Sequence, residues 1–131
     1  MALGQDGSVV GDRTLSTWDD LQQLIREFNE ARDWQQYHDP KSLCLALMGE
    51  MGELAAHFQW LTPAESDELK EDPVAFSAVR DEVADVTIYL LTFADRLGIE
   101  LPTAVLDKIN ANDLRYPEEK AKGRNLKHDQ L

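Results

Sequence analysis

The chain has 131 residues, of which 43% are hydrophobic and 29% are charged, as in one soluble globular domain rather than a disordered protein. Its 25 acidic and 13 basic residues give a formal charge of -12, which argues against a nucleic acid as partner because backbone binding relies on Lys and Arg. No apolar run approaches the ~20 residues that cross a bilayer, and the first residues carry no secretory signal, so we expect a cytoplasmic protein without a membrane partner.

The first helix is predicted from its N-cap signal. Residues 1–14 contain three glycines and little apolar periodicity, which indicates a flexible N-terminal arm. Ser16 or Thr17 then suits the N-cap of a helix that ends near residues 32–34. The other predicted elements are helices over residues 42–60, 73–96 and 102–115, a short acidic helical segment over 64–72, and a polar, disordered tail over 118–131.

Proline and glycine mark the ends of these helices. Pro73 and Pro102 suit first helical turns, and Gly98 suits the end of the third helix. Four amphipathic helices of this size predict an all-α, four-helix bundle-like domain over residues 15–117.

Two pairs of acids interrupt apolar helix faces. In the second helix Glu50 continues the stripe of Leu43, Leu47 and Leu54, and Glu53 lies one turn further on. No Lys or Arg occurs in this helix to pair with them.

The third helix repeats the pattern. From Val83 to Ala94 it is apolar nearly all round, which predicts an enclosed helix. Asp85 is the only charged residue in that stretch, and Glu82 lies one turn earlier on the same face. A lone E-x-x-E pair is more often a solvated acidic face, but both pairs here are embedded in apolar faces. Since clustered buried acids repel one another, they need cations, and oxygen-only ligands select Mg²⁺, with Mn²⁺ as the alternative.

A di-iron site is the competing metal site. Such bundles use Glu-x-x-His pairs. The three histidines, His38, His57 and His128, never stand three residues after a glutamate, which excludes that site.

These motifs make the chain similar to the all-α nucleoside triphosphate pyrophosphatases, the MazG-like superfamily, and most of all to the dCTP pyrophosphatase branch. The strings that carry the resemblance are ARDWQQYHDP, LALMGEMGELAAHFQWL, DEVADVTIYLL and KINANDLRYP, in this order within residues 14–117. The family signature is an E-x-x-E pair followed by an E-x-x-D pair on a later helix.

The resemblance implies Mg²⁺-dependent hydrolysis of a nucleoside triphosphate to the monophosphate and pyrophosphate, a role in nucleotide pool sanitation, and a homo-oligomer, with a tetramer favoured over a dimer. It implies that Glu50, Glu53, Glu82 and Asp85 are the metal-binding and catalytic residues. The substrate-binding residues that it implies are Trp34, His38, Trp60, Tyr89, Lys108, Asn112, Arg115 and Tyr116.

One position departs from the dCTP-specific relatives. They carry a histidine on the first helix near the base, where this chain has Ile25. We therefore expect dCTP or a related or modified pyrimidine deoxynucleotide as substrate. The alternatives are a broader dNTP or dUTP pyrophosphatase and a non-enzymatic helical interaction module.

Overall fold

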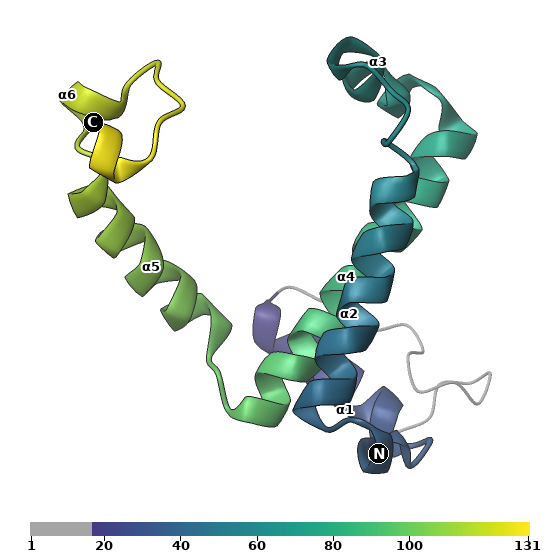
Figure 1. The fold of residues 1–131 in the computed structure, drawn as a ribbon. Helices are drawn as coiled ribbons and strands as arrows, with labels where there is room; N and C mark the ends of the chain where they lie inside the picture. Colours follow the sequence, from purple (N-terminus) through teal and green to yellow (C-terminus); the bar gives the residue numbers. More distant parts are fainter. Residues whose placement is uncertain (1–16) are drawn as a thin grey trace. The chain divides into compact units, whose positions relative to one another are not determined.

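The computed structural model describes residues 17–131, so the predicted arm over residues 1–14 lies outside the described part of the chain. Every regular element among these residues is helical, which confirms the all-α class. The predicted helices correspond to α1, α2, α4 and α5 (Figure 1). In chain order the elements are α1 (Trp18–Glu30), η1 (Trp34–Tyr37), α2 (Pro40–Ala56), α3 (Pro63–Glu68), η2 (Leu69–Glu71), α4 (Pro73–Leu97), α5 (Leu101–Arg115), α6 (Glu118–Ala121) and η3 (His128–Gln130).

Side-chain caps fix where the helices begin. Thr17 and Asp20 form a reciprocal capping box at the start of α1. Asp39 caps α2 by accepting from the Ser42 N–H, and Asp72 caps α4 in the same way. Each of these two aspartates precedes a proline, which suits the first helical position because it has no N–H that would lack a hydrogen-bond partner there. Helix α2 therefore begins at residue 40, slightly before the predicted start.

A sharp turn separates α1 from α2. Asp33 has a φ of 53°, which is the left-handed region that few residues other than glycine adopt. The Gln36 side-chain amide donates to both the backbone and the side-chain oxygen of Asp33. The turn begins η1 at Trp34, so it sets the direction in which that indole leaves the backbone.

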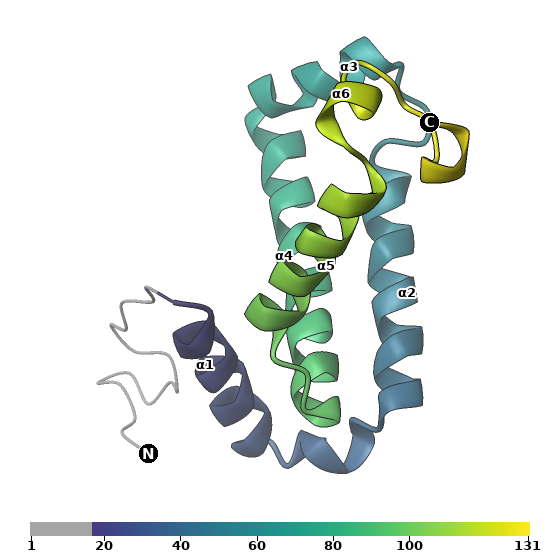
Figure 2. The ribbon, with the colours of Figure 1, turned by 90° about the vertical axis from the view of Figure 1, so that its left-hand side faces the viewer.

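The chain divides into two compact units, the first ending at Gly98 and the second running from Ile99 to Leu131. The division falls inside the single domain predicted over residues 15–117. In the first unit α4 packs against both α2 and α1, and α2 and α4 lie side by side (Figure 2). The second unit contains α5, α6 and η3. It has two helical turns in place of the disordered tail predicted over residues 118–131.

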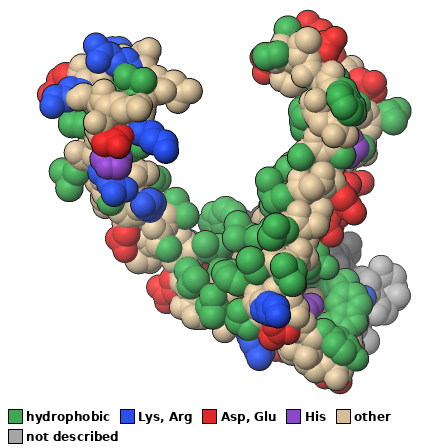
Figure 3. Space-filling view, in the orientation of Figure 1, with side chains coloured by type: hydrophobic (Ala, Val, Ile, Leu, Met, Phe, Trp, Pro, Cys, Tyr) green, Lys and Arg blue, Asp and Glu red, His purple; other side chains and the backbone are tan. Residues whose placement is uncertain are grey.

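The enclosed core is small. Within residues 17–131 the buried apolar side chains are Ile25, Leu43, Leu91 and Ala94. Hydrophobic side chains remain at the surface of both units (Figure 3). On α4 the exposed ones include Val83, Ile88 and Leu90, so the expected enclosure of this helix is wrong for the single chain. Neighbouring helices of the same unit are too few to surround it. Cys44, which the apolar run around it would bury, is also exposed. No helix in the described residues is long and apolar enough to cross a membrane.

Candidate active site

Helices α2 and α4 bring the two acidic pairs together. One carboxylate oxygen from each of Glu50, Glu53 and Glu82 lies within 4.8 Å of the other two. Asp85 is outside this tight group, but its charge acts on both Glu50 and Glu82, and it shares a pocket with Glu50. The packing of α2 on α4 thus produces the acidic cluster that the two sequence motifs predict.

Two of the four acids are partly buried and lack partners. Among residues 17–131, Oε2 of Glu50 and Oε2 of Glu82 are buried and accept no hydrogen bond. Partial burial raises the pKa of both carboxyls above the ordinary 4.5, and the charges of Glu53 and Asp85 raise it further. His57 offsets this slightly, because its Nε2 lies 3.9 Å from Glu82 Oε1.

The sequence suggested that the whole cluster is buried, but Glu50 and Glu82 are half-buried and Glu53 and Asp85 are exposed. The cluster nevertheless has the properties of a cation site. Its donors are carboxylate oxygens, the ligands that hard divalent cations prefer. The unpartnered oxygens of Glu50 and Glu82 are costly to bury without a compensating positive charge. These residues therefore fit a hard divalent cation.

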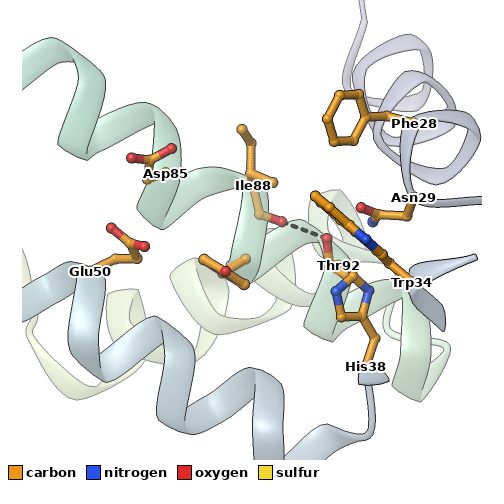
Figure 4. Close-up of a pocket in the computed structure, with 9 residues that line it drawn as sticks. Phe28, Asn29, Trp34, His38, Glu50, Asp85, Ile88 and Thr92 are labelled. Carbon is orange, nitrogen blue, oxygen red and sulfur yellow. Dashed lines mark hydrogen bonds between the residues drawn. The ribbon is translucent and has the colours of Figure 1, made fainter. Parts of the chain in front are cut away.

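A pocket of about 280 Å³ adjoins the acids. Figure 4 shows Glu50 and Asp85 at one end and Trp34, Asn29 and Phe28 at the other. The residues that line it are Phe28, Asn29, Trp34, His38, Glu50, Asp85, Ile88, Tyr89 and Thr92.

One face of α4 forms the floor between the two ends. Asp85, Ile88, Tyr89 and Thr92 follow at i, i+3, i+4 and i+7, so they lie on one side of the helix. Seven residues of helix span about 10 Å, which separates the acidic end of the pocket from its aromatic end. The pocket thus has an acidic end and an aromatic end on a common support.

The aromatic end is held by ring contacts. The Phe28 and Trp34 rings meet edge to face with centroids 5.8 Å apart. The Arg32 guanidinium lies 3.6 Å from the Phe28 ring centroid, a cation–π contact on the same assembly. Trp34 is 43% exposed, so part of its indole surface is free to stack on a planar ligand. Burial lowers the pKa of His38, and the positive charge of Arg96 lowers it further, which favours the neutral imidazole.

A second pocket of about 260 Å³ lies between α1 and α4 and shares Asn29, His38 and Thr92 with the first. At this second pocket Arg26 makes a bidentate ion pair with Asp95, with its Nε 3.0 Å from Oδ2 and its Nη2 2.6 Å from Oδ1. This pair ties α1 to α4 beside the second pocket.

The other predicted substrate residues do not line these pockets. Trp60 follows the end of α2 and is 87% exposed. Lys108, Asn112 and Arg115 share one face of α5, in the second unit, as their spacing predicts. Tyr116 also lies in the second unit, where its ring meets that of His128 edge to face. Their roles stay predictions.

Sequence reasoning missed four residues that line the first pocket, which are Phe28, Asn29, Ile88 and Thr92. Thr92 and Phe28 carry no signal that separates them from ordinary helix residues. Asn29 does, because it places an amide four residues after the buried Ile25, on the apolar face of α1. Ile25, the position at which the sequence departs from the dCTP-specific branch, belongs to the core and does not line either pocket.

Comparison with known proteins finds a matching family, similar sequences and a similar structure. Residues 47–131 match the MazG-like family. Among curated proteins, the chain is 40% identical over 131 residues to dCTP pyrophosphatase 1 of Homo sapiens, covering 98% of this chain and 77% of that protein. It is 41% identical over 115 residues to dCTP pyrophosphatase 1 of Mus musculus, covering 88% and 68%. A crystal structure of a pyrophosphatase from Archaeoglobus fulgidus superposes with a TM-score of 0.72 at 35% identity, covering 80% of this chain and 96% of that one.

Proposed function

Because this chain belongs to the MazG-like family and is a nucleoside triphosphate pyrophosphohydrolase, we propose that it hydrolyses dCTP, or a related or modified pyrimidine deoxynucleotide, to the monophosphate and pyrophosphate with Mg²⁺. The curated relatives named dCTP pyrophosphatase 1 support the substrate class. The observation that carries the mechanism is the cluster of Glu50, Glu53 and Glu82 beside a pocket with an aromatic end. A role in nucleotide pool sanitation and a cytoplasmic location stay predictions.

Glu50, Glu53, Glu82 and Asp85 are the proposed metal ligands. These four side chains would hold and orient a divalent cation, Mg²⁺ or Mn²⁺, from two helices. When bound, it would neutralise charge on the phosphates and lower the pKa of a coordinated water. The pKa of Glu50 and Glu82 is raised first by burial and then by the neighbouring acids, so a bound cation would offset both effects.

The other end of the pocket holds the nucleoside. Trp34 offers an exposed indole face, and its contact with Phe28 fixes the ring orientation before substrate arrives. Stacking on an aromatic ring is worth about 1–3 kcal/mol per base and tolerates every base. His38 and Tyr89 line the same space and are proposed to contact the nucleoside.

The remaining contacts are proposed to come from an assembly of several copies. Lys108, Asn112 and Arg115 form a polar stripe that suits triphosphate oxygens. Exposed apolar residues of the same helix, such as Val105 and Ile109, support its burial against other copies. We expect a homo-oligomer, a tetramer rather than a dimer, in which Trp60 closes over the base and Tyr116 contributes to the phosphate end. Light scattering of the purified chain tests the oligomeric state.

A pyrophosphate-release assay over all common NTPs and dNTPs with Mg²⁺ tests the proposal. We expect the highest turnover with pyrimidine deoxynucleotides and complete loss in EDTA. Glu53→Gln and Asp85→Asn should lose activity, whereas Glu68→Gln, an exposed acid of α3, should retain it as the matched control. Turnover that survives EDTA, or that is unchanged in both site variants, contradicts the metal mechanism.

A broader dNTP or dUTP pyrophosphatase is the second candidate. The core position of Ile25 favours it, because α1 supplies no imidazole to the base at that point. The same substrate panel distinguishes the two. The non-enzymatic helical module is set aside, since the chain is similar to pyrophosphatases along nearly all its length.

A further inference from the structure

Asn29 is a buried residue whose side-chain amide has no hydrogen-bond partner in the described part of the chain. It is 7% exposed, and it is the buried polar residue of the described core. Among residues 17–131 its side chain makes no hydrogen bond. Its amide atoms are not among the fully buried atoms without a partner, so they keep contact with solvent. The small surface that Asn29 keeps lies at the pockets that it lines.

The position of Asn29 points to a nucleoside base as the missing partner. In Figure 4 it lies beside Trp34, at the end of the pocket away from Glu50 and Asp85. The nearby Thr92 hydroxyl already donates to the carbonyl oxygen of Ile88 at 2.7 Å, so its proton is not offered to the amide. A base stacked on the Trp34 indole brings its polar edge to this end of the pocket.

We propose that Asn29 contacts the hydrogen-bonding edge of the base, and that its free amide accepts both amino and keto pyrimidines. This inference rests on the proposed pyrophosphohydrolase function. An amide presents one acceptor oxygen and an NH₂ donor. Cytosine presents an amino donor beside a ring-nitrogen acceptor, and uracil presents an N–H donor beside a carbonyl acceptor. Each edge matches the amide in one of its two flipped orientations.

The lack of a protein partner gives the amide this freedom. A neighbour that bonded to either Oδ1 or Nδ2 would fix one orientation and thereby select one base. No such neighbour exists among residues 17–131, so the substrate itself orients the amide. Stacking on Trp34 is indifferent to the base, and Asn29 adds an edge contact that is strong but permissive.

Steady-state kinetics on dCTP, dUTP and the abasic 2′-deoxyribose 5′-triphosphate test the inference. For the wild type we expect kcat/KM values for dCTP and dUTP within about tenfold. Asn29→Leu, of similar shape, should lower both by about ten- to a hundredfold, as expected for a lost buried polar contact, and leave the abasic substrate unchanged.

Asn29→Asp tests whether the amide donor is used. A carboxylate accepts from the donor of either base but has no N–H for the acceptor beside it, so kcat/KM for dCTP and for dUTP should both fall about ten- to a hundredfold while the abasic substrate is unchanged. This isosteric variant also serves if Asn29→Leu fails to fold. Gln22→Leu, a half-buried amide of α1 outside both pockets, is the matched control and should leave all three substrates unchanged.

The outcomes separate the two proposals. A wild type that hydrolyses no nucleotide refutes the proposed function, and the role of Asn29 with it. Activity with a dCTP preference above a hundredfold refutes the permissive amide alone. An equal loss on the abasic substrate in Asn29→Leu makes the residue merely structural and also overturns the inference.

Discussion

The bidentate ion pair between Arg26 and Asp95 joins α1 to α4, and its removal should loosen the base end of the pocket. Helix α1 carries Phe28 and Asn29, which line that end. We consider Arg26→Met, which keeps most of the side-chain stem, and Asp95→Asn, which keeps the shape but removes the charge.

The structure sets the size of the effect. Hydrogen bonds to charged groups contribute about 1.5–3 kcal/mol when buried, whereas exposed ion pairs contribute about 0.2–1 kcal/mol. The Arg26 and Asp95 side chains are 39% and 34% exposed, so solvent screening reduces the gain. We therefore expect a coupling free energy of about 1 kcal/mol, equivalent to roughly 3–5 °C in Tm at this chain length.

A double-mutant cycle in urea measures the coupling. The control cycle combines Arg26→Met with Asp81→Asn, at an exposed aspartate of α4, and should give a coupling near zero. Each single variant of the pair should also raise KM for the nucleotide more than it lowers kcat. A coupling below about 0.3 kcal/mol in the Arg26–Asp95 cycle, or an unchanged KM, would refute the reasoning.

Three further predictions concern the metal site and the core. In EDTA, the raised pKa of Glu82 means that the folded chain favours the protonated carboxyl, so this group stabilises the fold below pH 4.5 and the stabilisation is lost as the pH rises through the raised pKa. Glu82→Gln should therefore reduce the loss of stability with rising pH, which thermal unfolding at several pH values measures. Mg²⁺ at about 100 times its Kd should stabilise the wild type by about 2.7 kcal/mol, seen as a rise in Tm that Glu53→Gln abolishes; an equal rise in that variant would point to binding elsewhere. Leu43→Ala should lower the free energy of unfolding in urea by about 2–5 kcal/mol, because Leu43 is 1% exposed. Trp60→Ala should change it by less than about 0.5 kcal/mol, because Trp60 is 87% exposed. Equal losses would show that Trp60 is packed in solution.

Local chemistry made the helices and the acidic cluster predictable. Thr17, Pro73 and Gly98 act through bonds within a few residues, so their effects can be read from the chain. The i, i+3 spacing places each acid pair on one helix face, and the apolar stripes beside them make those faces meet.

The rest depends on packing between distant segments. The burial of Asn29 requires α1 to lie on α4, which its own sequence does not specify. The direction of Trp34 depends on the left-handed residue before it, and aspartate gives only a weak signal for that conformation. The exposure of α4 was unexpected because an apolar helix does not reveal whether its cover comes from the same chain.

The left-handed turn at Asp33 links the stability of this enzyme to the position of Trp34. A left-handed aspartate holds backbone strain that glycine at the same position would relieve. Glycine would keep the bond from Gln36 to the backbone oxygen of residue 33, but it would lose the bond to the side-chain oxygen, which also steadies the approach to Trp34. Selection for heat resistance alone would therefore favour replacing Asp33, and selection for nucleotide turnover would favour keeping it. The residue marks a point at which durability and catalysis compete.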